Sequence, residues 1–227
     1  MKLKAVLFDL DGTLLDTLPD IRDAMNTVLA RYGLPQYDTE SYREMIGWGI
    51  GRLAELALPE DSRDEVEVAE LAEEMRRAYR SHPLASSVPF AGVPELIGSL
   101  HSANVPMGVL SNKMHELTQR LIMNVWGEGV FAVVYGARDD LPMKPHPEAA
   151  QRIAVELGVK PYEMVFVGDS AIDMETAQAA GMYPVGVSWG YRDVEELWMH
   201  GAAMVVSSPE EISPLLLGGA HARQATD

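Results

Sequence analysis

The chain contains no cysteine. Disulfide bridges, thiolate nucleophiles and zinc sites with sulfur ligands are therefore excluded. Basic residues are also scarce, because 18 lysines and arginines stand against 34 aspartates and glutamates, which gives a formal net charge of -16. Binding to nucleic acid or to an anionic membrane depends on lysine and arginine, so neither partner is expected. An anionic substrate would need a local group of positive charges, and the only lysines are Lys2, Lys4, Lys113, Lys144 and Lys160.

Long apolar runs are absent as well. No stretch is long enough to cross a bilayer. The amino terminus, MKLKAVLFDLDG, lacks the apolar region and the small-residue cleavage site of a secretory signal. The cytoplasm is therefore the expected location. A chain of 227 residues can bury one good core, or a core together with a small second unit.

Short apolar runs rich in β-branched residues recur along the chain. We expect a strand in each of them: residues 5–10, 105–111, 130–136, 164–169, 184–188 and 202–207. Segments with helical periodicity lie between most of these runs, and several end in glycine, as helix C-caps do. This alternation predicts an α/β fold, a Rossmann-like parallel sheet with helices on both faces. Ligands of such sheets bind at the carboxyl ends of the strands, where Asp9, Ser111 and Asp169 fall.

One region, residues 16–83, interrupts the alternation with helical segments only. Thr39 is the expected N-cap of one helix and Gly33 the expected C-cap of another. A helical insertion of this size predicts a small α-helical cap domain, with hinges at residues 15–17 and 83–89. The complete division is a core domain of residues 1–15 and 84–220, a cap domain of residues 16–83 and a disordered tail of residues 221–227.

Four short stretches carry the candidate chemistry: DLDGT from Asp9, LSNK from Leu110, MKPHPE from Met143 and GDSAID from Gly168. They contain four aspartates, Asp9, Asp11, Asp169 and Asp173, but only one lysine, Lys144, that we expect in the site. A phosphate monoester is a dianion, so a site with this balance needs a divalent cation to hold it. Mg²⁺ is a hard cation that prefers oxygen ligands, and carboxylates suit it.

In this order, the four stretches resemble the motifs of the haloacid dehalogenase superfamily. Its phosphatases carry a DxDGT nucleophile loop, a serine or threonine at a strand end, a lysine and a GDxxxD metal loop. The helical insertion also lies where that family has its cap, so the resemblance covers essentially the whole chain. It implies a Mg²⁺-dependent phosphomonoester hydrolase that acts on a small phosphorylated metabolite through an aspartyl-phosphate.

The resemblance also implies roles for individual residues. Asp9 is the expected nucleophile, and Asp11 is the expected acid for the leaving group and base for water. The expected metal ligands are a carboxylate oxygen of Asp9, the main-chain carbonyl of Asp11 and the carboxylate of Asp169, with Asp173 in or just behind that shell. The expected phosphate-binding groups are Gly12, Thr13, Ser111, the main chain of Asn112 and Lys144.

Within the superfamily, the chain looks most like the phosphoglycolate phosphatases. Dehalogenases lack an aspartate at the position of Asp11, and phosphonoacetaldehyde hydrolases need a cap lysine, whereas this chain has none between Lys4 and Lys113. We expect the cap residues Gly47, Trp48, Gly49 and Arg52 to contact the substrate.

Other functions remain open from the sequence. Two departures leave the substrate open: the stretch GARDDLP, where the family usually has Gly-Gly-Asp, and Ser111 in place of the commoner threonine. The alternatives are a broader sugar-phosphate or nucleotide phosphatase, a mutase similar to β-phosphoglucomutase, and a non-enzymatic receiver-like phospho-acceptor or binding module. We expect a monomer or a homodimer. Four residues near the motifs are expected to be surface groups: Lys113, Asp139, Asp140 and His146.

Overall fold

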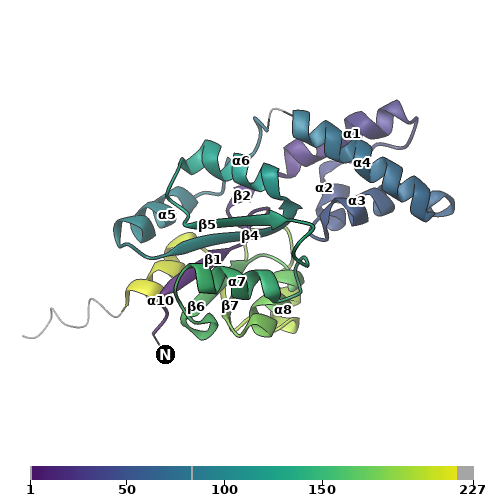
Figure 1. The fold of residues 1–227 in the computed structure, drawn as a ribbon. Helices are drawn as coiled ribbons and strands as arrows, with labels where there is room; N and C mark the ends of the chain where they lie inside the picture. Colours follow the sequence, from purple (N-terminus) through teal and green to yellow (C-terminus); the bar gives the residue numbers. More distant parts are fainter. Residues whose placement is uncertain (1, 83, 219–227) are drawn as a thin grey trace, which may run out of the picture.

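The computed structural model describes residues 2–82 and 84–218. Figure 1 shows an open sheet with helices on both sides, and a separate group of helices at the upper right. The tail expected at residues 221–227 lies outside the described residues. In the described part of the chain, no helix combines the length and the apolar character needed to cross a membrane.

Six parallel strands form the sheet, in the order β5-β4-β1-β6-β7-β8. Their bounds are β1 (Ala5–Phe8), β4 (Met107–Met114), β5 (Val133–Ala137), β6 (Met164–Gly168), β7 (Tyr183–Val187) and β8 (Met204–Val206). Each lies in one of the six apolar runs, apart from small shifts at its ends. The predicted α/β fold with a parallel sheet is confirmed.

Both faces of the sheet are buried. Val6 and Phe8 of β1 belong to one hydrophobic cluster, whereas Ala5 and Leu7 belong to another, as the two-residue period of a strand requires. Figure 1 shows α5 and α6 on one side of the sheet and α7 and α8 on the other. The helices of this part are α5 (Val93–Ser102), α6 (His115–Trp126), α7 (Glu148–Glu156), α8 (Ala171–Ala180), α9 (Val194–Met199) and α10 (Ser213–Leu217).

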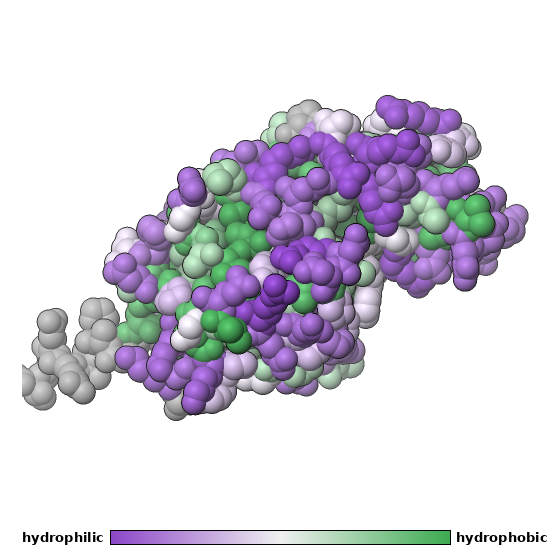
Figure 2. All heavy atoms as spheres, in the orientation of Figure 1, coloured by the Kyte–Doolittle hydropathy of each residue, from purple (hydrophilic) through white to green (hydrophobic). Residues whose placement is uncertain are grey.

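Four helices form the group that we call the cap: α1 (Leu18–Arg31), α2 (Thr39–Met45), α3 (Gly49–Ala57) and α4 (Glu65–Ser81). The highly charged α4 buries Leu71, Met75 and Tyr79 on its inner face, and the larger hydrophobic cluster continues from the sheet into the cap. The division of the chain into two independent domains stays a prediction. Figure 2 shows hydrophilic residues over most of the surface in view.

The prediction for the start of α2 was wrong by one residue. Asp38 is the N-cap, because its carboxylate accepts a hydrogen bond from the main-chain N–H of Ser41 at 2.8 Å. Thr39 is the first residue of the helix. Aspartate and threonine both cap helices, and here the stronger capping residue precedes the weaker one.

The two connections between cap and sheet run side by side. β2 (Leu15–Asp16) pairs with β3 (Val88–Pro89) in a short antiparallel sheet. Near it, the buried carboxylate of Asp20 in α1 accepts hydrogen bonds from the main-chain N–H of Ser86 and, at 2.6 Å, from the hydroxyl of Ser87. These bonds fix the second connection to the first helix of the cap.

Candidate active site

The carboxyl ends of three neighbouring strands bring the motif residues together. Asp9 follows β1, Asp169 follows β6, and Ser111 lies in β4, which pairs with β1. Asp173 comes from the first turn of α8. Residues more than 160 positions apart in the chain therefore meet at one edge of the sheet, as parallel strands require.

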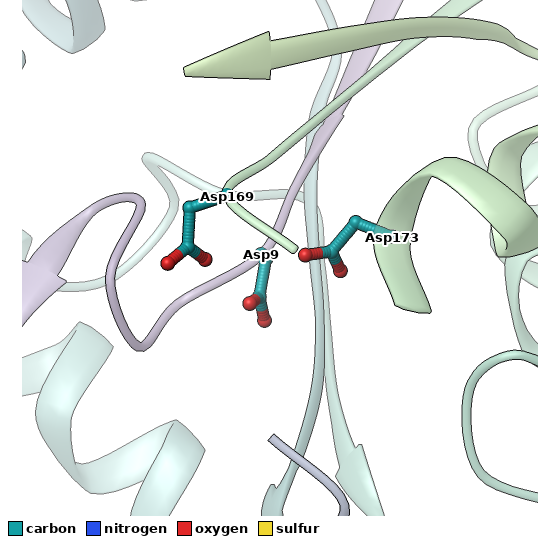
Figure 3. Close-up of side chains that lie close together, drawn as sticks. All are labelled: Asp9, Asp169 and Asp173. Atoms are coloured by element: carbon teal, nitrogen blue, oxygen red, sulfur yellow. The ribbon is translucent and has the colours of Figure 1, made fainter. Parts of the chain in front are cut away.

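Three buried carboxylates lie close together at this edge: those of Asp9 and Asp169 point the same way, and that of Asp173 points toward them (Figure 3). In Asp9, Asp169 and Asp173, one carboxylate oxygen of each residue lies within 4.8 Å of the other two. The oxygens of Asp169 are held by the hydroxyl of Thr13, at 3.2 Å, and by the main-chain N–H of Tyr191, at 2.8 Å. The site therefore concentrates negative charge in a place where water cannot screen it.

A single buried ammonium group faces these carboxylates. Nζ of Lys144 donates a hydrogen bond to Oδ1 of Asp173 at 2.7 Å. It also lies 2.7 Å from Oδ1 of Asp9. This second contact is an ion pair. Burial disfavours the charge on Lys144, but the attraction of Asp173 and Asp9 outweighs it and raises the pKa of the lysine.

The local electrostatics favour a cation at the three carboxylates. Burial, followed by repulsion from Asp173, raises the pKa of Asp169 to about 7. The same two causes raise the pKa of Asp9 well above its ordinary value, although Lys144 opposes them. A divalent cation would compensate the charges that one ammonium leaves unbalanced, and the oxygen donors suit Mg²⁺. The residues present therefore fit a divalent metal, because one carboxylate oxygen of each of the three aspartates lies within 4.8 Å of the other two.

Glycine is required where the loop after β1 turns. Gly12 has a φ of +85°, and a Cβ there would lie 2.2 Å from Oδ2 of Asp169. A side chain would therefore push the loop away from that carboxylate. Gly12 and Thr13 pack directly against the acidic cluster.

Asp11 lies apart from the three clustered carboxylates. Its Oδ1 accepts a hydrogen bond from Nζ of Lys113 at 2.8 Å and another from the hydroxyl of Thr17. The expectation that Lys113 is a surface residue was wrong, since its side chain is only 3% exposed. β4 continues to Met114 instead of ending at Ser111. The pairing of β4 with β5 is irregular between Leu110 and Met114, and both Ser111 and Lys113 line the cavity described below.

Asn112 connects the two halves of the site. Its side-chain N–H groups donate to the main-chain oxygens of Gly47 and Lys144, each at 3.0 Å. Its side-chain oxygen accepts from the main-chain N–H of Lys144 at 2.9 Å. The neighbouring Ser111 is buried. Asn112 therefore fixes the loop that carries Lys144 and joins it to the cap.

A cavity of about 1050 Å³ lies between the cap and the carboxyl edge of the sheet. Its floor includes Asp9, Asp11, Ser111, Lys144 and Asp169. The cap residues predicted to contact substrate, Gly47, Trp48, Gly49 and Arg52, all line it. Trp48 is half-exposed, and the guanidinium of Arg52 pairs with Glu55 at 2.7 Å. His146, Asp139 and Asp140 are exposed, as expected.

Several residues near the cavity were missed in the sequence. The hydroxyl of Tyr191 accepts from the main-chain N–H of Thr17 at 2.9 Å and donates to Asp16 at 2.9 Å, so it holds the first hinge. The guanidinium of Arg192 donates to the main-chain oxygen of Ile46 in the cap at 2.9 Å. Both follow β7, and their place after the carboxyl end of a parallel strand is the signal that could have identified them.

Comparisons with known proteins agree with this geometry. A family model described as haloacid dehalogenase-like hydrolase matches residues 6–187. The chain is 32% identical to an N-acetylmuramic acid 6-phosphate phosphatase from Pseudomonas aeruginosa, over 95% of this chain and 96% of that protein. It is 33% identical to a phosphoglycolate phosphatase from Chromobacterium violaceum, over 96% of this chain and 98% of that protein.

A solved structure extends the likeness to the complete fold. A candidate phosphoglycolate phosphatase from Lactobacillus delbrueckii subsp. bulgaricus superposes with a TM-score of 0.88 at 30% identity, covering 96% of this chain and 100% of that chain. Sequence motifs, site geometry and fold agree, and the chain belongs to the haloacid dehalogenase-like hydrolase family.

Proposed function

We propose that the protein is a Mg²⁺-dependent phosphomonoester hydrolase that works through an aspartyl-phosphate on Asp9. The observation that carries this proposal is the buried cluster of Asp9, Asp169 and Asp173. The single ammonium group of Lys144 does not balance the charge of three carboxylates. A receiver-like phospho-acceptor has no leaving alcohol to cover, so it would not need a cavity of about 1050 Å³ between a cap and the sheet.

The metal would be held by a carboxylate oxygen of Asp9, the main-chain oxygen of Asp11 and the carboxylate of Asp169. Asp173 orients Lys144 through its hydrogen bond and adds negative charge close to the metal. When bound, the cation neutralises the substrate phosphate and draws it toward the nucleophile. The expected phosphate-binding groups besides Lys144 are Gly12, Thr13, Ser111 and the main chain of Asn112.

The reaction divides into two displacements. A carboxylate oxygen of Asp9 attacks the phosphorus, the bond to the leaving oxygen breaks, and Asp11 gives that oxygen its proton. Water then attacks the aspartyl-phosphate and loses a proton to Asp11. Inorganic phosphate leaves, and the carboxylate of Asp9 is restored. Lys144 would contribute its positive charge to both steps from a position that Asp173 fixes before substrate binds.

We propose 2-phosphoglycolate as the substrate, supported by the similarity to the phosphoglycolate phosphatases of Chromobacterium violaceum and Salmonella typhimurium. In this assignment Arg52 is the expected partner of the substrate carboxylate, because a guanidinium binds a carboxylate through two parallel hydrogen bonds. A phosphorylated acidic sugar is the second candidate. The N-acetylmuramic acid 6-phosphate phosphatase matches over nearly the whole chain, and the cavity has room for a sugar.

The test is phosphate release with Mg²⁺ or with a chelator, across 2-phosphoglycolate, N-acetylmuramic acid 6-phosphate, hexose phosphates and nucleoside monophosphates. We expect release that requires Mg²⁺ and is lost in Asp9→Asn. A preference for 2-phosphoglycolate would support the first assignment, and a preference for the acidic sugar phosphate the second. Interconversion of hexose phosphates without phosphate release would instead indicate a mutase. Absence of both reactions would contradict the proposed function.

A further inference from the structure

We infer that Lys113 is a positioning residue for Asp11, and that its contact with Tyr79 makes this positioning depend on the cap. The inference rests on the proposed function, in which Asp11 exchanges a proton with the leaving group. The residues that it joins come from three places: the loop after β1, the end of β4 and the inner face of the cap helix α4.

Asp11 is held through one of its two carboxylate oxygens. Lys113 and Thr17 both donate to the same oxygen, Oδ1. No residue within 2–82 and 84–218 donates a hydrogen bond to the other oxygen, Oδ2. A carboxylate anchored through one oxygen keeps a fixed orientation, while the second oxygen remains available to carry a proton to a ligand in the cavity.

Among residues 2–82 and 84–218, Lys113 forms an ion pair with Asp11 alone. Its ammonium pairs with Asp11, whereas Lys144 pairs with Asp9 and Asp173. The two buried lysines therefore contact different parts of the site. Lys144 lies beside the proposed nucleophile and metal ligands, and Lys113 lies beside the proposed proton carrier for the leaving group. Lys144 is the expected phosphate-binding lysine, whereas the ion pair of Lys113 is with Asp11.

Lys113 also contacts the cap, through Tyr79 of α4. Nζ of Lys113 lies 4.7 Å from the centre of the Tyr79 ring. Tyr79 is buried and lines the cavity. The ring stabilises the ammonium as a cation–π partner and also keeps water away from it.

Movement of the cap would therefore change how firmly Lys113 holds Asp11. When α4 lies over the sheet, the Tyr79 ring and the Asp11 carboxylate enclose the Lys113 ammonium. Little water then reaches the contact between Lys113 and Asp11, so it is weakly screened. When α4 moves away, water reaches the ammonium and weakens its hold on Asp11. The proton carrier is thus held firmly only when the cap covers the substrate, which links chemistry to closure.

The choice of leaving group makes the proposal testable. An alcohol leaving group needs a proton as the P–O bond breaks, whereas p-nitrophenolate leaves readily without one. Misplacing the proton carrier should therefore slow the hydrolysis of an alkyl phosphate much more than that of p-nitrophenyl phosphate. Loss of structure or of phosphate binding would slow both reactions equally.

The experiment compares kcat/KM for 2-phosphoglycolate, or the alkyl phosphate that the wild type hydrolyses fastest, with kcat/KM for p-nitrophenyl phosphate. The ratio kcat/KM reports the first displacement only, whereas kcat also contains the second, in which Asp11 takes a proton from water whatever the leaving group was. For Lys113→Met we expect a fall of about 10-fold to 100-fold on the alkyl phosphate, and of less than about threefold on the aryl phosphate. Lys113→Arg keeps the charge and should restore part of the loss. Tyr79→Leu should give a change of about threefold to tenfold in the same direction, and it decides the question if Lys113→Met does not fold.

The matched control is Lys160→Met. Lys160 is an exposed lysine whose Nζ lies 5.6 Å from the centre of the Tyr162 ring, outside the cavity. This variant should leave both rates unchanged. If the Lys113 and Tyr79 variants slow both substrates equally, or slow neither, the positioning role is wrong while the proposed function stands. A wild-type protein that hydrolyses neither substrate would instead overturn the proposed function itself.

Discussion

Removing one carboxylate of the acidic cluster should stabilise the metal-free protein. Burial and the neighbouring Asp173 raise the pKa of Asp169 to about 7, whereas the ordinary value is 3.8. Between these two values the folded protein holds more protons than the unfolded chain does. The free energy of unfolding must therefore fall as the pH rises through this interval, and it stays low above it.

The size of the effect follows from the same two values. The interval from 3.8 to about 7, at about 1.4 kcal/mol per pH unit, corresponds to about 4 kcal/mol. In Asp169→Asn the amide has nearly the same shape and does not ionise. Its oxygen can still accept from the main-chain N–H of Tyr191, and its NH₂ group can donate to Thr13. We expect the variant to gain roughly 2 to 4 kcal/mol over the wild type at about pH 8.

Urea unfolding with a chelator, measured from about pH 5 to about pH 8, tests this expectation. The advantage of Asp169→Asn should grow with pH. Mg²⁺ should reduce it, because a ligand that binds only the folded wild type stabilises that state. Asp140→Asn is the control, since Asp140 is exposed and its pKa is lowered by Arg138. A difference that does not change with pH, or a variant less stable than the wild type at pH 8, would refute the reasoning.

Three further predictions concern the nucleophile, the hinge and the cap. Asp9→Asn should abolish phosphate release without lowering the unfolding midpoint; release within about tenfold of the wild type would argue against a nucleophile. Asp20→Ala should lower the free energy of unfolding by about 2 to 4 kcal/mol in urea titrations, because the hydroxyl of Ser87 and a main-chain N–H lose their buried acceptor; an unchanged value would mean that water replaces the carboxylate. In the double variant Trp48→Cys and Met143→Cys, the two new thiols are the only ones in the chain. A reducible cross-link between them should stop turnover until it is reduced. Unchanged turnover would show that the cap need not move.

The sequence was sufficient for the sheet and for the acidic cluster because both follow from local patterns. Buried parallel strands can be recognised in the sequence as short apolar runs, and the carboxyl ends of such strands lie at one edge of the sheet. Asp9, Ser111 and Asp169 could therefore be expected together although they lie far apart in the chain, whereas Lys144 was expected in the site from the resemblance of its motif.

The sequence was insufficient where the outcome depends on packing between distant elements. Lys113 follows a serine and an asparagine and could start a helix or end a strand, and only the continuation of β4 to Met114 buries it. Tyr79 belongs to a highly charged helix, and its position over Lys113 depends on how the cap packs on the sheet. Tyr191 reaches Thr17 across 174 positions, a contact that no local pattern records.

The pairing of β2 with β3 also has an evolutionary consequence. Leu15 lies opposite Pro89 and Asp16 opposite Val88, so the chain leaves the sheet and returns to it at nearly the same point. An insertion whose two ends meet can be lengthened, shortened or exchanged without separating the strands that flank it. Asp9 and the acidic cluster can thus be inherited unchanged, while the segment between two adjacent backbone positions is replaced.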